Sequence, residues 1–262
     1  MGNKVGAFAE YICATPEQVQ LIPDPVSDVS AAALVGAVVS YGAVVDMAGV
    51  KEGEVVLVTG ANGGLGSVAC QVAKALGATV IGLVTSEEKA QDVKRRYGIQ
   101  TVVYGQEWED HVKRLGGGGV HAVIDNVGLV EGSLRCLRFG GRIILVGFAG
   151  RKGVMEKIGM NKILLKGARV IGYVGFVSVC QSTTDVNSLQ RFGEQTRQNP
   201  QMSRAMWDGY LQMLADGAVE ATIHQKQYSG VEQIPTALQD LEDHKVSGKA
   251  VVQVSSESKA KL

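Results

Sequence analysis

The stretch VVLVTGANGGLG, residues 55–66, decides the fold of this chain. Its first five residues are apolar or β-branched, and they predict a strand buried on both faces in a parallel sheet. The glycine-rich segment that follows predicts a sharp turn. A helix is predicted directly after the turn, over residues 67–76.

The turn resembles the dinucleotide fingerprint G-x-G-x-x-G, although residues 61–66 read A-N-G-G-L-G, with an alanine in first place. In such a turn Gly63 lets the backbone approach a pyrophosphate, and Gly66 lets the helix pack closely on the strand. The helix N-terminus adds free N–H groups and a partial positive charge. A purely structural turn is the alternative. We expect a dinucleotide site formed by Asn62, Gly63, Gly64, Leu65 and Gly66.

Short strands and helices alternate along the central part of the chain. We predict strands over residues 55–59, 79–83, 101–104, 122–125, 142–146 and 170–173. We predict helices between them over residues 67–76, 87–97, 108–115 and 131–137. This alternation indicates βαβ units. The fold class is therefore α/β, with a doubly wound parallel sheet of six strands.

The flanking segments follow a different pattern. Before the central part we predict a strand over 6–13 and two helices, over 28–35 and onward to about residue 48. After it we predict a helix over 203–215, a segment 221–228, a helix over 233–244 and a strand over 249–254. These pieces do not form a complete domain by themselves.

Composition gives no support for several classes of partner. The formal net charge is 0, so electrostatics gives no reason to expect nucleic acid or an anionic membrane as a partner. No apolar run is long enough to span a bilayer. The four cysteines form no C-x-x-C pair, which argues against a zinc or redox motif, and we expect buried thiols. They are Cys13, Cys70, Cys136 and Cys180.

The last three residues are Ala260, Lys261 and Leu262, a close variant of the S-K-L peroxisomal signal. The polar tail over residues 255–262 is predicted to be flexible, as an import receptor requires. A chance ending is the alternative. We expect binding to the peroxisomal import receptor and a peroxisomal location, with the cytoplasm as the alternative.

Several motifs in order resemble the medium-chain dehydrogenase/reductase superfamily, in its zinc-free quinone oxidoreductase and enone reductase branch. The longest similar segment is AGVKEGEVVLVTGANGGLGSVACQVAKALGATVIG, residues 48–82. The others are GAFAEYI (6–12), DNVG (125–128), RFGGRIILVGFAG (138–150), NKILLKGARVIGYVGF (161–176) and SGKAVVQV (247–254). The tail is similar to that of a prostaglandin reductase of this branch.

The resemblance implies a Rossmann domain with a partial GroES-like barrel domain. It divides the chain into a barrel remnant (1–40), an NADP-binding domain (41–178), a return segment (179–254) and a flexible tail (255–262). Relatives open with a larger barrel, of which this chain carries only the final strands. Zinc-binding members have a cysteine ligand where this chain has Val35, and their other ligands would precede it. No metal site is therefore expected.

The end of the second strand indicates NADPH. Enzymes that use NAD usually carry an acid there for the ribose 2′-hydroxyl, but residues 83–86 read L-V-T-S. Ser86 can donate a hydrogen bond to a 2′-phosphate, and Lys89 can pair with it. Tyr104 matches a tyrosine that touches this phosphate in relatives. Alternatively, Lys89 is a solvated helix lysine and Tyr104 a strand-end aromatic residue.

Other contacts are expected where strands end, because doubly wound folds bind ligands there. Asn126 follows the fourth strand, and Gly147 and Phe148 follow the fifth. Gly175 and Phe176 follow the sixth and should lie near the nicotinamide. Both phenylalanines could equally be packing residues.

Three functions fit these observations. In the first, NADPH reduces a quinone, an enone or an enoyl thioester by hydride transfer. In the second, the chain is a dinucleotide-binding remnant with weak or no catalysis that needs a partner. In the third, it is a zinc-free, NAD-dependent alcohol dehydrogenase, against which the missing acid argues.

No catalytic residue is assigned. Tyr41 lies near the cofactor edge by the resemblance, but it is as readily a packed helix tyrosine. The histidines are scattered and form no catalytic constellation. The resemblance also implies a homodimer, in which the strand over residues 170–173 pairs with its counterpart in the second copy.

Overall fold

The computed structural model describes residues 9, 12–13, 19–148, 150, 156–173 and 200–254. Its centre is a parallel six-stranded sheet in the order β3-β2-β1-β4-β5-β6. The strands are β1 (Val55–Thr59), β2 (Thr79–Val84), β3 (Gln100–Val103), β4 (Val120–Asp125), β5 (Leu137–Leu145) and β6 (Arg169–Gly172). Strand order reverses between β1 and β4, and this is the point where doubly wound sheets bind their ligands. The predicted fold class is confirmed.

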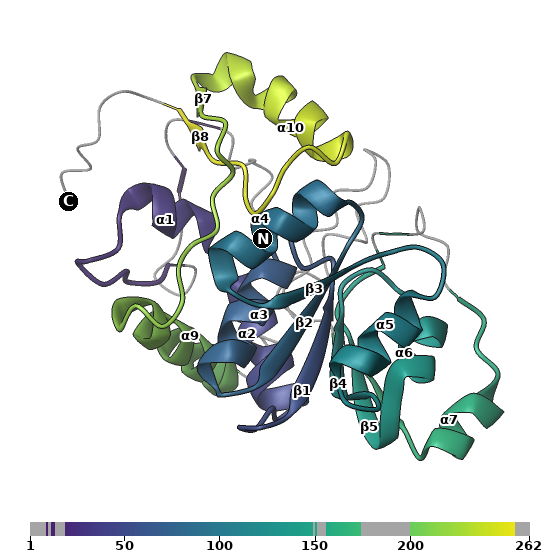
Figure 1. Cartoon of the computed structure of the whole chain (residues 1–262). Coiled ribbons are helices and arrows are strands. Elements are labelled where there is room, and N and C mark those ends of the chain that lie inside the picture. Colours follow the sequence, from purple (N-terminus) through teal and green to yellow (C-terminus); the bar gives the residue numbers. More distant parts are fainter. Residues whose placement is uncertain are drawn as a thin grey trace.

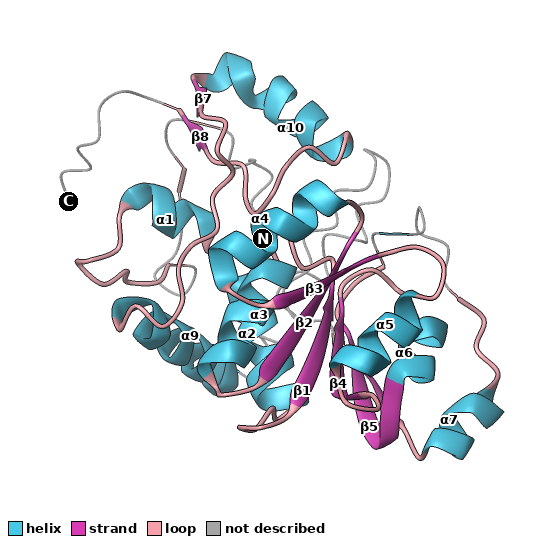
Figure 2. Cartoon of the chain, in the orientation of Figure 1, coloured by secondary structure: helices cyan, strands magenta, loops and turns pink. Residues whose placement is uncertain are grey.

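Helices cover both faces of the sheet (Figures 1 and 2). One face carries α2 (Ala37–Gly42), its continuation as the π-helix η2 (Ala43–Met47), α3 (Gly66–Ala75) and α4 (Glu87–Tyr97). The other face carries α5 (Trp108–Leu115) and α6 (Val130–Cys136). α1 (Asp28–Ala33) precedes α2, and α7 (Met160–Lys166) leads into β6.

Two hydrophobic cores follow from the alternation of side chains along the strands. Val56 and Val58 of β1 belong to the core under α2, α3 and α4, whereas Leu57 belongs to the core under α5 and α6. In β5, Ile144 and Ile143 divide in the same way. Because both faces of each central strand are buried, the strands read as continuous apolar runs in the sequence.

The return segment begins with α9 (Pro200–Ala215), which packs against α2. It continues through β7 (Tyr228–Ser229), η5 (Val231–Gln233), α10 (Ile234–Glu242) and β8 (Val252–Gln253). β7 and β8 form a two-stranded parallel sheet beside α10 (Figure 1). No helix in the described residues is long and apolar enough to cross a membrane.

Most predicted elements agree with the structure, and three differ, one of them β5, which begins at Leu137 and not at residue 142. The helix α7 was not predicted, because its apolar residues Met160, Leu164 and Leu165 are exposed and form no buried stripe. The predicted strand over 249–254 is reduced to the two residues of β8, preceded by isolated bridges. The predicted strand over 6–13 lies almost entirely outside the described residues. The predicted domain boundaries stay predictions.

An ion pair fixes the end of the sheet opposite the glycine turn. The Arg142 guanidinium is almost fully buried and donates to Glu54 at 2.5 and 2.9 Å. It also donates to the carbonyl oxygens of Ala48 and Gly49. These bonds join the end of η2 to β5 and satisfy the buried cation.

The pair predicts a pH-dependent contribution to stability. The hydrogen bond from Arg142 lowers the pKa of Glu54 below its ordinary 4.5. A depressed folded pKa gives stability that is present above the unfolded pKa and lost as pH falls through the folded pKa. Glu54→Gln should therefore lower the free energy of unfolding by about 1–3 kcal/mol at pH 7 and by less below pH 4. Urea unfolding across pH tests this, with the exposed Glu52→Gln as control.

Candidate functional site

The glycine turn joins β1 to α3 with the close approach that a phosphate cradle needs. Gly60 has a φ of +63°, and the Gly63 N–H donates to the Gly60 carbonyl oxygen at 2.9 Å. A Cβ added at Gly66 would overlap that carbonyl oxygen and lie 2.7 Å from its carbonyl carbon. Gly66 is therefore required for the first turn of α3 to begin directly on the strand. This is the predicted role of the third glycine.

The loop after β4 is held by a fully buried carboxylate. Asp125 accepts from the Thr59 hydroxyl at 2.7 Å and from the N–H groups of Val127, Gly128 and Leu129 at 2.8–3.0 Å. Burial raises the pKa of Asp125, and these four hydrogen bonds oppose the rise. The carboxylate thus ties the loop after β4 to the end of β1. Sequence reasoning did not assign it this role.

Asn126 presents an acceptor at the same edge. Its N–H donates to the Thr59 hydroxyl and its amide NH₂ to the Thr59 carbonyl oxygen, each at 2.9 Å. Its Oδ1 is buried and has no hydrogen-bond partner among the described residues. A buried acceptor without a donor fits a ligand hydroxyl, and a dinucleotide carries such hydroxyls on its riboses. This unpartnered oxygen supports the prediction that Asn126 faces the cofactor.

The residues predicted to select NADPH gather where β2 ends. Ser86 caps α4 and accepts from the Lys89 N–H at 3.3 Å, while the Lys89 ammonium donates to the Thr85 hydroxyl at 3.1 Å. The Tyr104 N–H donates to the Val84 carbonyl oxygen at 2.8 Å, and its side chain is half exposed. Ser86 and Lys89, at the start of α4, and Tyr104, directly after β3, are therefore brought to one end of the sheet.

The loop after β5 lies beside the loop after β4. The N–H of Gly147 donates to the Asp125 carbonyl oxygen at 3.2 Å, and a Cβ added at Gly147 would lie 2.8 Å from the Asn126 carbonyl oxygen. Phe148 is 41% exposed, so it is free to meet a ligand. Gly175 and Phe176, also predicted to contact the cofactor, lie outside the described residues.

Tyr41 takes part in helix packing. Its hydroxyl lies against Gly209 of α9, and its ring meets that of Tyr210 edge-on at 6.4 Å. Burial, with a smaller effect of Asp46, raises the pKa of Tyr41.

In the described residues no group of three or more His, Cys, Asp or Glu side chains is placed to hold a metal ion.

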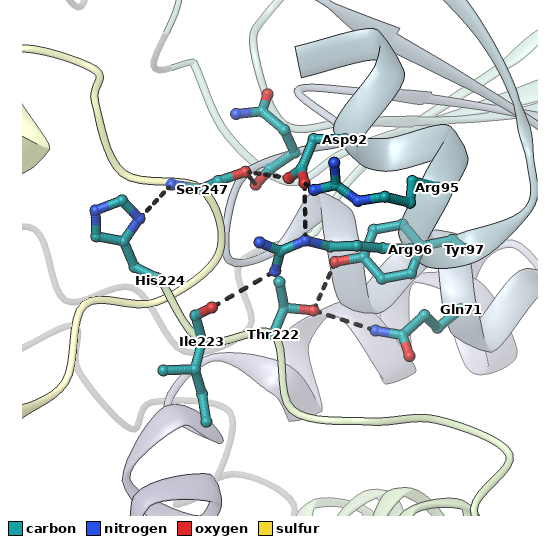
Figure 3. Close-up of polar contacts among 10 residues, drawn as sticks. Gln71, Asp92, Arg95, Arg96, Tyr97, Thr222, Ile223, His224 and Ser247 are labelled. Atoms are coloured by element: carbon teal, nitrogen blue, oxygen red, sulfur yellow. Dashed lines mark hydrogen bonds and ion pairs between the residues drawn. The ribbon is translucent and has the colours of Figure 1, made fainter. Parts of the chain in front are cut away.

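The return segment docks on α3 and α4 (Figure 3). Thr222 contacts the Gln71 amide at 3.3 Å and the Tyr97 hydroxyl at 2.8 Å. The Ser247 hydroxyl donates to Asp92 at 3.2 Å.

The return segment also contacts the glycine turn, because the Gly248 N–H donates to the Asn62 carbonyl oxygen at 2.8 Å. The segment thus reaches the candidate site from the far end of the chain. The sequence motif at residues 247–254 carries no local signal that would assign it to the site.

Comparisons with known proteins agree with this geometry. The model of the zinc-binding dehydrogenase family matches residues 64–188. Acryloyl-coenzyme A reductase of Sulfurisphaera tokodaii is 42% identical over 48% of this chain and 36% of its own length. Human quinone oxidoreductase is 34% identical over 66% of this chain and 53% of its own length. The chain therefore matches about half or less of these two relatives.

A solved structure matches the chain almost throughout. A probable oxidoreductase from Mycobacterium abscessus superposes with a TM-score of 0.78 at 28% identity, covering 96% of this chain and 71% of its own. The similarity therefore includes the return segment as well as the six-stranded sheet.

Proposed function

Because this chain belongs to the medium-chain dehydrogenase/reductase superfamily, we propose that it binds NADPH and reduces a quinone or an α,β-unsaturated carbonyl compound. The observation that carries the proposal is the meeting of the glycine turn, Asn126 and the Ser86–Lys89 pair at one edge of the sheet. The two curated relatives act on a quinone and on acryloyl-coenzyme A, as their names state. In both, the reducible group is conjugated to a carbonyl.

The residues of this chain would bind and orient the cofactor. Residues 62–66 at the N-terminus of α3 would hold the pyrophosphate. The unpartnered Oδ1 of Asn126 would accept from a ribose hydroxyl. NADPH supplies the hydride, so the protein has to align the nicotinamide with the substrate and exclude water. No proton donor is assigned among the described residues.

The proposed preference for NADPH over NADH predicts that Lys89→Met changes the binding of the two nucleotides differently. Removing the ammonium should weaken NADPH binding about tenfold and leave NADH binding unchanged, because only NADPH carries the 2′-phosphate. Titration of both nucleotides, followed by their fluorescence, measures this. Lys94→Met is the matched control, because Lys94 is an exposed lysine of the same helix. Equal losses for both nucleotides would contradict the assignment.

The reaction is tested by NADPH oxidation with a quinone, an enone and an enoyl thioester as substrates. Turnover of at least one supports the proposal. Tight NADPH binding without turnover would favour the second candidate, a dinucleotide-binding protein that needs a partner. Oxidation of alcohols with NAD would favour an alcohol dehydrogenase.

One observation favours the second candidate. Large apolar side chains near the start of the described part are exposed, with Leu21 at 90%, Val35 at 58% and Val29 at 48%. Where such side chains form one contiguous patch, the patch usually contacts another protein or another domain.

We also propose a homodimer and a peroxisomal location. The edge strand β6 is flanked by exposed Phe139, Met160, Leu164 and Leu165, which supports pairing with a second copy at this edge. The peroxisomal proposal rests on Ala260, Lys261 and Leu262, which lie outside the described residues.

A further inference from the structure

The return segment rests on the glycine turn through residues 247 and 248. The Gly248 N–H donates to the Asn62 carbonyl oxygen at 2.8 Å, and Gly248 forms a parallel bridge with Gly63. The Ser247 hydroxyl, which donates to Asp92 at 3.2 Å, lies 3.5 Å from the same Asn62 oxygen. The position of Ser247 therefore affects how closely the return segment contacts the turn.

His224 holds the backbone of Ser247. The Ser247 N–H donates to Nδ1 of the imidazole at 3.4 Å, and Figure 3 shows Ser247 between His224 and Asp92. The backbone N–H of His224 donates to the Lys249 carbonyl oxygen at 2.8 Å, so side chain and backbone both join residue 224 to this strip. Nδ1 can accept only while the ring is neutral, with its proton on Nε2.

Tyr228 of β7 supports the imidazole. The two rings lie nearly parallel, with an angle of 26° between them and 6.4 Å between their centroids. The Tyr228 hydroxyl donates to Asp240 of α10 at 2.8 Å, which fixes the position of the tyrosine ring. The imidazole is therefore held between β7 and the strip at residue 247.

The surroundings of the ring disfavour its protonated form. Burial lowers the pKa of His224 below the ordinary 6.5, Lys226 and Arg96 lower it further, and Asp240 opposes them. Asp240 already accepts from Lys226 at 2.5 Å and from the Tyr228 hydroxyl. The charged or titratable groups on the elements around the ring are Asp92, Arg96, Lys226, Tyr228, Asp240 and Lys249.

We propose that His224 is a positioning residue of the dinucleotide site, whose neutral ring holds the return segment against the glycine turn. This inference rests on the proposed function. Protonation turns Nδ1 from an acceptor into a donor, so the Ser247 N–H would face another N–H. The segment then loses a hydrogen bond beside its contact with Asn62. The alternative is a histidine that only packs on Tyr228.

The sign of the pH dependence follows from linkage. The ring is harder to protonate when the segment is docked than when it is not, so undocking takes up a proton. Docking, and with it dinucleotide affinity, should be strongest above the ordinary 6.5 and should weaken as the pH falls below it. Linkage is reciprocal, so a bound dinucleotide should lower the pKa of His224 further.

The first test is calorimetric titration with ADP-ribose between about pH 5 and pH 8, where histidine changes its charge. ADP-ribose carries the pyrophosphate but not the 2′-phosphate of NADPH, which would itself titrate in this range. Wild-type protein should bind about fivefold more weakly at the acid end, which corresponds to the loss of about one hydrogen bond.

Two variants separate the hydrogen bond from packing. His224→Asn keeps an acceptor close to the position of Nδ1 at every pH, so its affinity should equal that of wild type at about pH 8 and stay level in acid. His224→Leu has no acceptor and should bind about fivefold more weakly at every pH. His244→Asn is the matched control, because His244 is an exposed histidine of the same segment, and it should keep the wild-type profile.

Nuclear magnetic resonance titration of the imidazoles in wild-type protein needs no variant. Saturating ADP-ribose should move the midpoint for His224 to lower pH and leave that for His244 unchanged. An unchanged His224 midpoint, or wild-type affinity that stays level into acid, would overturn the inference and leave the proposed function standing. Failure of the wild type to bind either NADPH or ADP-ribose would overturn the proposed function and this inference together.

Discussion

Gly66→Ala is expected to abolish measurable dinucleotide binding and to lower the free energy of unfolding by about 3 kcal/mol. The added Cβ would overlap the Gly60 carbonyl oxygen and lie 2.9 Å from the Cα of Ala61. These are backbone atoms, so they cannot move aside as a side chain would. α3 would have to shift away from β1, and the N–H groups at its start would move with it. Urea unfolding and nucleotide fluorescence measure the two effects.

The matched control is Gly105→Ala. A Cβ there meets nothing within 4 Å, so stability should change by less than about 0.5 kcal/mol. Gly63→Ala should fall between the two, since its Cβ would lie 3.3 Å from the Gly60 carbonyl oxygen. If Gly66→Ala binds NADPH as tightly as Gly105→Ala does, the close approach of helix and strand is not what forms the site.

Asp125→Ala should cost about 3–5 kcal/mol of unfolding free energy and weaken NADPH binding strongly. The substitution leaves the Thr59 hydroxyl and the N–H groups of residues 127–129 without their common acceptor. The Thr59 hydroxyl also accepts from the Asn126 N–H, so the candidate ribose contact loses its support as well. Chemical denaturation and NADPH titration measure these losses.

A graded series separates geometry from charge at this position. Asp125→Asn keeps Oδ1, which accepts three of the four hydrogen bonds, but places an amide against the Leu129 N–H. It should cost about half as much as Asp125→Ala. The exposed Asp24→Ala should change little. Equal, small effects for all three variants would show that the loop after β4 is held by packing instead.

The six-stranded parallel sheet could be predicted from the sequence because each strand is a short apolar run between helices. The limits of α4 agree with the prediction, since Ser86 caps its start and Gly98, with a φ of +61°, ends it. Both residues carry a local signal. α7 also ends at such a glycine, Gly167 with a φ of +54°, but no side chain caps its start, and Leu164 and Leu165 face outward.

The glycine turn and the strand-end residues were predicted for the same reason, since each follows a strand directly. Asp125 and Gly248 were not predicted as site residues. The role of Asp125 depends on Thr59, which is 66 residues away, and the Ser247 contact with Asn62 joins residues 185 apart. Contacts of this separation depend on how the return segment docks. No local pattern in the sequence indicates that docking.

Titration of the folded chain with NADPH and then NADH, followed by nucleotide fluorescence, tests the central claim most directly. We expect micromolar binding, equivalent to about −8 kcal/mol, with NADPH preferred by about tenfold. A folded chain that binds neither nucleotide would contradict the claim that this edge of the sheet is a dinucleotide site.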